Sequence, residues 1–288
     1  MTLAIYHIQE RKEILRGENI MSRLLFIMAV IAVCGACSNS NNGSSATTTT
    51  TTTVTSSSTA YVTTVEGDGA QYYWILNDTG SSFADQVGGN IGHGSQGYNS
   101  NAAPGSIISD GYTAVSLVGG IISTSISAPA PTTFSEEVWF QTTTPGGRIF
   151  GFGNSLSNTS SSYDRHIYMD DSGYVYFGAL VNGLTTSVSN LVNYDDGNWH
   201  HVVGTCCTGT NGMNLYVDGA LVASADASVN DMTNYSGFWR MGSDNLTHWP
   251  GNWQQGVVTG FFGNIDDAAI YPTILTPTQI LNHFNVAQ

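Results

Sequence analysis

Residues 196–223 read DGNWHHVVGTCCTGTNGMNLYVDGALVA and contain two strand patterns followed by a hairpin. Residues 199–205 alternate large and small side chains, and residues 213–217 alternate at the two-residue period of a β-strand. Asp218-Gly219 supplies the positive φ that a two-residue hairpin turn requires, so residues 220–223 are expected to return antiparallel. The stretch therefore predicts paired antiparallel strands.

Short strand patterns recur along the chain from Gln71 onward, separated by Gly, Asn, Asp or Pro. Many short strands at this spacing are typical of a β-sandwich or jelly roll. One helix is expected at residues 277–284, where Thr276 suits the N-cap and Pro277 the first helical position. Its apolar residues form a single stripe, namely Ile280, Leu281 and Phe284. We predict an all-β fold, a two-sheet antiparallel jelly-roll sandwich with one short C-terminal helix.

Further motifs flank the hairpin. Residues 73–78 (YWILND) precede a turn at 83–90, residues 135–140 follow S-x-E-x-W-F, and residues 263–271 follow G-x-I-D-x-x-x-I-Y. With the W-H-x-V-x-G-T and L-Y-V-D-G patterns of the hairpin, they resemble the laminin-G-like (LamG) jelly roll of the concanavalin A-like lectin/glucanase superfamily. The resemblance covers residues 65–288 and implies this fold while saying little about function. Asn77 departs from the family, which usually has an acidic residue there.

The charge balance is strongly acidic. After Cys37 the chain has no Lys and three Arg, against fifteen Asp and three Glu, a net charge near −15. Nucleic acids and anionic membranes require a basic face, so the composition excludes them as partners. The simplest interpretation is that acidity keeps a Lys-poor surface soluble; Ca²⁺ binding and a saline habitat are alternatives.

The N-terminal region has the pattern of an export signal. Arg23 precedes the apolar residues 24–33, which are too few to form a stable membrane span. Gly35-Ala36 then precede Cys37, which resembles a bacterial lipoprotein signal, although Cys34 replaces the usual Leu. We predict that residues 21–37 are a lipoprotein-type signal peptide and that a lipid on Cys37 anchors the protein to a membrane, facing outside or the periplasm. Plain secretion is the alternative.

Two further segments lie outside the predicted domain. Residues 1–20 place charged and polar residues ahead of the signal, so we interpret them as an upstream extension and place the translation start at Met21. Residues 38–64 are rich in Ser and Thr and lack the apolar residues that offset ordering entropy, which predicts a flexible linker. The plan is one jelly-roll domain, residues 65–288, on a stalk.

The carboxylates do not form a hydrolase pattern. Polysaccharide-cleaving relatives use paired carboxylates on one strand, whereas Glu136 and Glu137 are adjacent and point to opposite faces. Asp170-Asp171 and Asp195-Asp196 lie in turn-like contexts. His200-His201 lie on a predicted strand, where core histidines bonded to backbone are expected. No catalytic residue is assigned, and a lyase or hydrolase with an unfamiliar site remains an alternative.

A calcium site is the best metal hypothesis, and it comes from the family resemblance. Many jelly rolls of this type hold one Ca²⁺ between the first turn and the last strand, which implies Asp85, Asn90 and Asp266 as oxygen ligands. The alternative is that Asp85 and Asn90 build the turn and Asp266 caps backbone N–H groups.

Aromatic residues in loops suggest a ligand site. Tyr235, His248, Trp249 and Trp253 lie in or beside the long segment 230–259. Exposed indole faces stack on sugar rings, so these four residues are the candidate glycan-binding residues. The alternative is that Trp249 and Trp253 fold back over the sandwich as a lid.

Cys206-Cys207 are two neighbouring cysteines in an exported chain, with a vicinal disulfide or a bond to another chain as their options. Their position between two strands also suggests a staple for a binding loop. The predicted function is a non-catalytic surface module that binds glycan or another cell-surface protein in an adhesive role. The alternatives are a polysaccharide-degrading enzyme and a spacer without a ligand.

Overall fold

A computed structural model describes residues 57–107, 111–228, 230, 232–251 and 260–288. These residues contain two helices and fifteen strands, in the order α2 (Ser57–Gly67), β1 (Tyr72–Trp74), β2 (Ser82–Phe83), β3 (Gly92–Pro104), β4 (Thr113–Thr124), β5 (Ala128–Pro129), β6 (Phe134–Gln141), β7 (Gly147–Gly153), β8 (Tyr163–Met169), β9 (Val175–Val181), β10 (Leu184–Val188), β11 (Trp199–Cys206), β12 (Gly209–Val217), β13 (Ala220–Ala227), β14 (Ser236–Gly242), β15 (Phe262–Tyr271) and α3 (Pro277–Val286).

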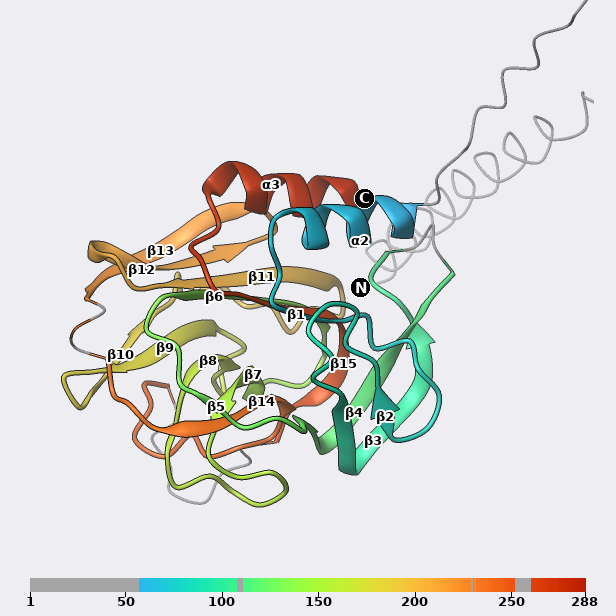
Figure 1. Ribbon diagram of the computed structural model, residues 1–288, viewed down its shortest axis with the longest axis horizontal. Helices are drawn as coiled ribbons and strands as arrows, with labels where there is room; N and C mark the ends of the chain where they lie inside the picture. The colour runs from blue at the N-terminus through green and yellow to red at the C-terminus, as the bar shows by residue number, and fades with distance from the viewer. Residues whose placement is uncertain (1–56, 108–110, 229, 231, 252–259) are drawn as a thin grey trace, which may run out of the picture. The chain divides into compact units, whose positions relative to one another are not determined.

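The strands form one large curled antiparallel sheet. Its hydrogen-bonded order is β10-β9-β8-β7-β14-β4-β15-β6-β11-β12-β13, with β1 on β15, β3 on β4, β2 on β3 and β5 on β14. The sheet curls until its end strands β10 and β13 contact each other, so two layers enclose one core (Figure 1). The predicted all-β jelly roll is confirmed, and its two predicted sheets are joined through continuous hydrogen bonding.

The hairpin predicted within residues 196–223 is present. Val202 of β11 pairs with Val217 of β12, and β12 turns back into β13 through Asp218 and Gly219, both at positive φ. β11 also pairs with β6, which places Trp139 opposite His201. The hairpin is thus one side of the curled sheet.

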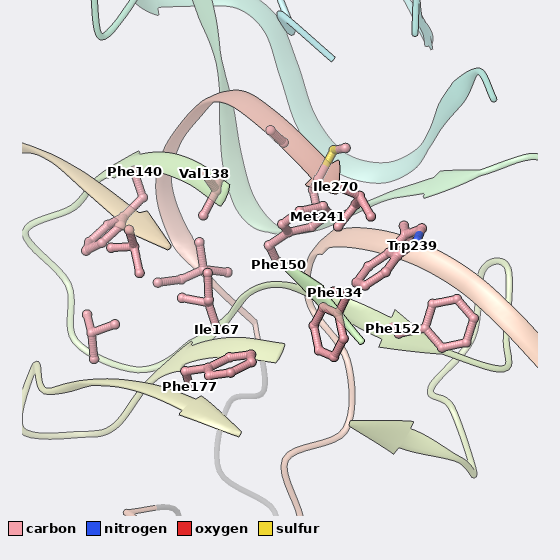
Figure 2. Packing of buried hydrophobic residues seen from close by; sticks show 14 of the residues in the cluster. Phe134, Val138, Phe140, Phe150, Phe152, Ile167, Phe177, Trp239, Met241 and Ile270 are labelled. Atoms are coloured by element: carbon pink, nitrogen blue, oxygen red, sulfur yellow. The ribbon is translucent and has the colours of Figure 1, made fainter. Parts of the chain in front are cut away.

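Aromatic rings from both layers fill the core (Figure 2). The ring centroid of Phe134 on β6 lies 6.0 Å from that of Phe177 on β9 and 6.0 Å from that of Trp239 on β14. Trp139 and Trp239 are buried, while Trp199 is half-buried against a second apolar cluster beneath the helices. Because such rings bury large apolar areas, this cluster supplies most of the hydrophobic stabilisation.

Helices α2 and α3 lie side by side over the outer face of β6, β11 and β15 (Figure 1). The prediction that a flexible linker extends to residue 64 is wrong, because the helix α2 starts at Ser57. Tyr61 and Val65 are four residues apart, so they share one helix face, and both are fully buried against the sheet. The described residues therefore contain two helices, whereas the sequence predicted only the C-terminal one.

Helix α3 begins with the expected cap. The Thr276 side chain accepts a hydrogen bond from the backbone N–H of Gln279, the Gln279 side chain bonds back to the N-cap, and Pro277 follows. The helix continues to Val286. Ile280 is buried, but Leu281 is 47% exposed, so the predicted apolar stripe is narrower than expected.

Within the described part of the chain, no helix is long and apolar enough to cross a membrane. The predicted upstream extension 1–20, the signal peptide 21–37 with Cys37, and linker residues 38–56 lie outside the described residues.

Candidate functional site

Trp249, a predicted sugar-stacking residue, is buried and only 2% exposed. Its ring packs edge-on against His166, at 4.2 Å between centroids, and against Tyr168, at 6.0 Å. A Cβ at Gly178 would overlap the indole, so this glycine on β9 makes room for the ring. The expectation that Trp249 exposes a ring face is wrong. Trp249 instead folds back over the sheet, as in the alternative in which it is part of a lid.

The other aromatic candidates do not join it in a site. The hydroxyl of Tyr235 donates to Asp164 Oδ1 at 2.6 Å, and its ring faces the Arg165 guanidinium at 5.7 Å, so Tyr235 stabilises a buried ion pair. His248 is exposed and has a positive φ. Trp253 lies outside the described residues. Of the described candidates, only His248 is exposed, since Trp249 is buried and Tyr235 is bonded to Asp164.

The predicted calcium ligands are already occupied by protein donors. Asp85 accepts hydrogen bonds from four backbone N–H groups, those of Tyr73, Val87, Gly88 and Asn90. The amide oxygen of Asn90 accepts from the Ile126 N–H, and Asp266 accepts from the Ser106 N–H and hydroxyl. No group of three His, Cys, Asp or Glu side chains suited to a metal occurs among the described residues. Calcium binding stays a prediction, and the turn-building role of Asp85 and Asn90 is observed.

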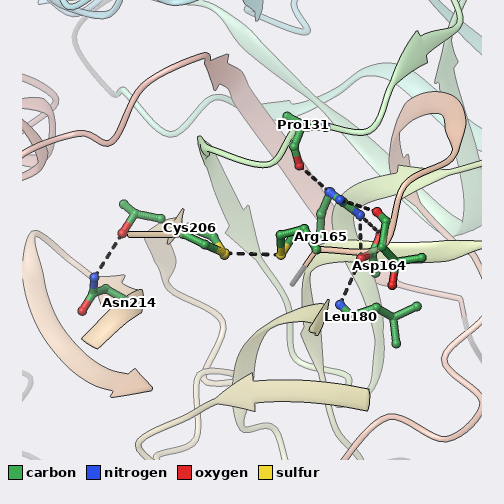
Figure 3. Close-up of a disulfide and its surroundings, with 10 residues drawn as sticks. Pro131, Asp164, Arg165, Leu180, Cys206 and Asn214 are labelled. Atoms are coloured by element: carbon green, nitrogen blue, oxygen red, sulfur yellow. Dashed lines mark hydrogen bonds and ion pairs between the residues drawn. A yellow bond between two sulfur atoms is a disulfide. The ribbon is translucent and has the colours of Figure 1, made fainter. Parts of the chain in front are cut away.

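Cys206 and Cys207 form a vicinal disulfide at the end of β11. Both are fully buried in the apolar core, and the Cys207 sulfur contacts the Met232 sulfur at 3.4 Å. Figure 3 shows Cys206 in the same region as the Arg165–Asp164 ion pair, whose nitrogen and oxygen are 2.6 Å apart. This burial places the disulfide in the core, so the suggestion that it staples a binding loop is wrong.

The carboxylates expected in turns do occupy them. Asp170 Oδ1 accepts from the backbone N–H groups of Ser172 and Tyr174, which closes the turn before β9. The histidines differ from expectation: His200 lies 2.9 Å from Asp218 and His201 lies 2.6 Å from Glu137, so both face carboxylates and not backbone.

A polar pocket of about 390 Å³ opens where the β3–β4 pair, the β7–β8 loop and the segment after β14 meet. This volume falls in the range of small-molecule sites. The residues that line it are Gln96, Gly119, Ile121, Ser157, Asn158, Thr159, Arg240, Ser243, Asp244 and Gly260.

Glycines create the space beneath the pocket. Gly120 on β4 faces Gly97 on β3 so closely that a Cβ at Gly120 would overlap the carbonyl oxygen of Gly97. Gly242, at the end of β14, has φ +82° and a Cβ there would overlap the carbonyl oxygen of Gly120. Side chains at these positions would push the strands apart, so the glycines allow three backbones to meet.

Buried ion pairs hold the pocket wall in place. Arg240 Nη1 donates to the carbonyl oxygens of Ser155 and Asn158, at 2.7 and 2.9 Å, and so ties the β7–β8 loop to β14. Asp244 Oδ2 lies 3.1 Å from Arg240 Nη1 and 3.0 Å from Arg148 Nη1. Burial and the charge of Arg148 lower the pKa of Arg240 to about 10, while Asp244 opposes that shift, so Arg240 stays charged at neutral pH.

The exposed side chains of the described pocket lining are polar and uncharged. The side chains of Gln96, Ser157, Asn158 and Thr159 are exposed, and none of them makes a hydrogen bond to another of the described residues. Ser243 Oγ, also at the pocket, is a buried hydroxyl without a partner among those residues. Amide and hydroxyl groups can both donate and accept, so this arrangement suits a ligand with several hydroxyls.

Sequence reasoning missed this pocket. The aromatic residues of segment 230–259 drew attention, whereas the pocket is built from short polar residues on three segments far apart in the chain. The available signals were the run NSLSNTSSS at residues 154–162 and the arginine at 240, and neither indicates a pocket without the contacts between strands.

The fold is similar to that of several solved structures. The Trypanosoma rangeli sialidase in complex with sialic acid matches with TM-score 0.50 and 13% identity, covering 74% of this chain and 32% of that one. The binding domain of Paraclostridial mosquitocidal protein 1 matches with TM-score 0.53 and 13% identity, covering 76% and 52%. The binding domain of botulinum neurotoxin serotype D matches with TM-score 0.51 and 14% identity, covering 77% and 52%. The chain thus spans about a third of the sialidase and about half of the two binding domains.

At this level of identity the structural matches show a common fold alone. No curated protein matches the chain in sequence. A laminin G family model, described as the concanavalin A-like lectin/glucanases superfamily, matches residues 118–281, which is more than half of the chain. The chain belongs to the concanavalin A-like lectin/glucanases superfamily.

Proposed function

We propose that this protein is an exported, non-catalytic carbohydrate-binding module, and that its ligand binds in the polar pocket between the β3–β4 pair and the β7–β8 loop. The observation that carries the proposal is the set of four exposed amide and hydroxyl side chains in one concave site, Gln96, Ser157, Asn158 and Thr159, which make no hydrogen bond to another described residue. Sugar hydroxyls are both donors and acceptors and match such groups.

Two further points support a sugar ligand. The superfamily contains lectins and glucanases by its description, and one protein of similar fold, the Trypanosoma rangeli sialidase, was solved in complex with sialic acid. The described pocket lining has no aromatic ring, so hydrogen bonds rather than stacking would supply most of the affinity.

The pocket chemistry favours binding over cleavage. Hydrolysis of a glycosidic bond requires two carboxyl groups on either side of that bond. Asp244 is the one carboxylate in the described lining, and it is buried between Arg148 and Arg240. Its lone pairs also accept from the N–H and hydroxyl of Ser160, so it has no freedom to act as acid, base or nucleophile.

The proposed setting is the outer face of a membrane. Cys37 would carry the lipid and the Ser/Thr-rich residues 38–56 would separate the domain from the bilayer. In this arrangement the module would hold a glycan, or a glycan-bearing surface, close to the cell in an adhesive role.

A glycan array followed by calorimetry on the full chain tests the pocket. Asn158→Ala removes a side chain that makes no hydrogen bond to another described residue, and Gln96→Ala does the same on β3. Each lost hydrogen bond is worth about 1 kcal/mol, so each variant should weaken binding roughly fivefold and the double variant more. Asn282→Ala is the matched control, because Asn282 is an exposed asparagine on α3.

Two results would overturn the proposal. One is that no glycan binds to the full chain, and the other is that glycan binding survives unchanged in the Gln96→Ala, Asn158→Ala double variant. Release of reducing ends from a bound polysaccharide would contradict the non-catalytic part on its own.

A further inference from the structure

We infer that the pocket is selective for neutral glycans and rejects sugars that carry carboxylate, sulfate or phosphate groups. The inference rests on the proposed function of the same pocket and names the class of its ligand. It comes from where the arginines of the domain lie.

The domain has no exposed Lys or Arg side chain for an anionic ligand. After Arg23 the sequence contains no Lys and three Arg. All three, Arg148, Arg165 and Arg240, are fully buried. Arg165 pairs with Asp164 at 2.6 Å, and Arg148 pairs with Asp244 at 3.0 Å. Acidic sugars are usually held by charge-assisted bonds from guanidinium or ammonium groups, and the described surface offers neither.

Arg240 is the one arginine in the pocket lining, and its side chain is fully buried. Nη1 donates to the carbonyl oxygens of Ser155 and Asn158 and to the hydroxyl of Ser160, all within 2.9 Å. It also lies 3.1 Å from Asp244 Oδ2. A ligand carboxylate could bond this nitrogen only by breaking the bonds that hold the β7–β8 loop. Arg240 Nε has no partner among the described residues, but it is buried with the rest of the side chain, so Arg240 shapes the wall without meeting a ligand anion.

The net charge of the whole domain adds to this selectivity. With its arginines buried in ion pairs, the domain presents carboxylates to solvent, including Glu66, Asp171, Asp196 and Asp226. The net charge of the domain is near −15, from three Arg against fifteen Asp and three Glu. An approaching anion is repelled by this field and must lose its hydration without a compensating cation, whereas a neutral sugar meets neither cost.

Matched pairs of glycans test the inference on the full chain by calorimetry. An array that contains neutral and acidic glycans first identifies the type of glycan that binds. The neutral and acidic members of a matched pair are then compared, for example lactose with sialyllactose, or a galacto-oligosaccharide with oligogalacturonate. The neutral member should bind at least about tenfold tighter, which corresponds to about 1.4 kcal/mol. Its affinity should stay constant between low and high NaCl, because no ion pair forms.

A charge-introducing variant tests the physical cause. Thr159 is exposed in the pocket and makes no hydrogen bond to another described residue, so Thr159→Arg adds the missing cation without removing an internal contact. We expect Thr159→Arg to raise the affinity for the acidic member at least fivefold at low salt, and the gain should disappear at high salt. Thr159→Gln, which adds length without charge, is the control and should give no such gain.

The outcomes separate this inference from the proposed function. Equal or tighter binding of the acidic member, lost in Asn158→Ala, overturns neutral selectivity and leaves glycan binding in the pocket standing. Binding of neither class, or binding that Asn158→Ala does not affect, overturns the proposed function of the pocket and this inference with it.

Discussion

At the residue scale, two neighbouring glutamates on β6 have opposite environments. Glu136 faces the core, and neither of its carboxylate oxygens has a partner among the described residues. Burial raises its pKa well above the usual range, although nearby Arg148 opposes the shift. Glu137 faces the helices, and successive side chains of a strand point to opposite faces. Sequence alternation therefore predicted that these two carboxyl groups could not act together.

Glu137 is the centre of a buried polar cluster beneath the helices, which we call the Glu137 cluster. Its oxygens accept hydrogen bonds from Tyr61 at 2.9 Å and Tyr271 at 2.6 Å, and they lie 2.6 Å from His201 Nε2 and 3.0 Å from His283 Nδ1. Burial alone would raise the pKa of Glu137, but the charge of His283 and the bonds from both histidines hold that pKa well below its usual range.

His283 is the cationic member of the Glu137 cluster. Its Nε2 lies 2.9 Å from Asp68 Oδ2, so the ring joins two carboxylates. Burial would lower the pKa of His283, but the charges of Glu137 and Asp68 and the hydrogen bonds to them raise it to about 9. The imidazolium is therefore the form that holds α3 to the sheet at neutral pH.

Replacing His283 with Gln should change both the stability and its pH dependence. The folded-state pKa lies above the unfolded value of about 6.5, so the contribution of His283 is complete below pH 6.5 and is lost as pH rises through about 9. Removing one partner of a buried ion pair costs about 3 kcal/mol, so His283→Gln should lower the free energy of unfolding at pH 7 by roughly that amount. Urea unfolding between pH 6 and 9.5 should show a smaller decline for the variant than for the wild type.

The exposed His248 supplies the control for that experiment. His248→Gln should leave the free energy of unfolding and its pH slope close to wild type. An equal decline from pH 6 to 9.5 in wild type and His283→Gln would show that His283 does not carry this pH dependence.

At the element scale, α2 shows how a tertiary contact creates structure from an unpromising sequence. Residues 57–64 are rich in Ser and Thr, which have low propensity for helix interiors. The helix nevertheless has two fully buried apolar side chains, Tyr61 and Val65. Tyr61 completes the docking, because its hydroxyl donates to Glu137 and accepts from Trp139 Nε1 at 2.9 Å. The outer face of the sheet supplies the partners that hold α2 in place.

Removing the Tyr61 hydroxyl should loosen α2 selectively. Tyr61→Phe keeps the packed ring but leaves Trp139 Nε1 without its acceptor and Glu137 without one donor. We expect a loss of about 1–2 kcal/mol in the free energy of unfolding and faster hydrogen exchange of the α2 amides relative to those of β11. Tyr174→Phe is the matched control, since the half-buried Tyr174 hydroxyl has no hydrogen-bond partner among the described residues. Unchanged exchange in α2 would contradict the role given to Tyr61.

At the scale of the whole molecule, the distribution of charge follows from where the chain buries its arginines. Composition predicted an acidic protein, but only the fold pairs Arg148 and Arg240 with Asp244 and removes Arg165 from the surface. Buried guanidinium groups require bonded acceptors, so each arginine ties segments together and none remains for solvent. The same burial underlies the proposed preference for neutral sugars.

The attachment of the whole molecule to a membrane is proposed to depend on Cys37. In a bacterial host that processes lipoproteins, the wild-type chain should fractionate with membranes and carry a lipid at its N-terminus. Cys37→Ser removes the acylated thiol and should release the protein into the soluble exported fraction, with an unlipidated mass. Cys34→Ser is the control and should keep the membrane fraction. A Cys37→Ser chain that stays in the membrane fraction would contradict the anchor.

The sequence by itself determined most of the strands, the Asp218-Gly219 hairpin, the cap of α3 and the acidic charge, because periodicity, turn chemistry and composition are local properties of the chain. The strand β3 (Gly92–Pro104) has no such pattern and was not predicted. The tertiary structure decided that Trp249 is buried, that residues 57–64 are helical, and that Gln96, Asn158 and Ser243 share a pocket. These features depend on contacts between residues far apart in the sequence, and such contacts exist only once the sheet has curled and brought its strands together.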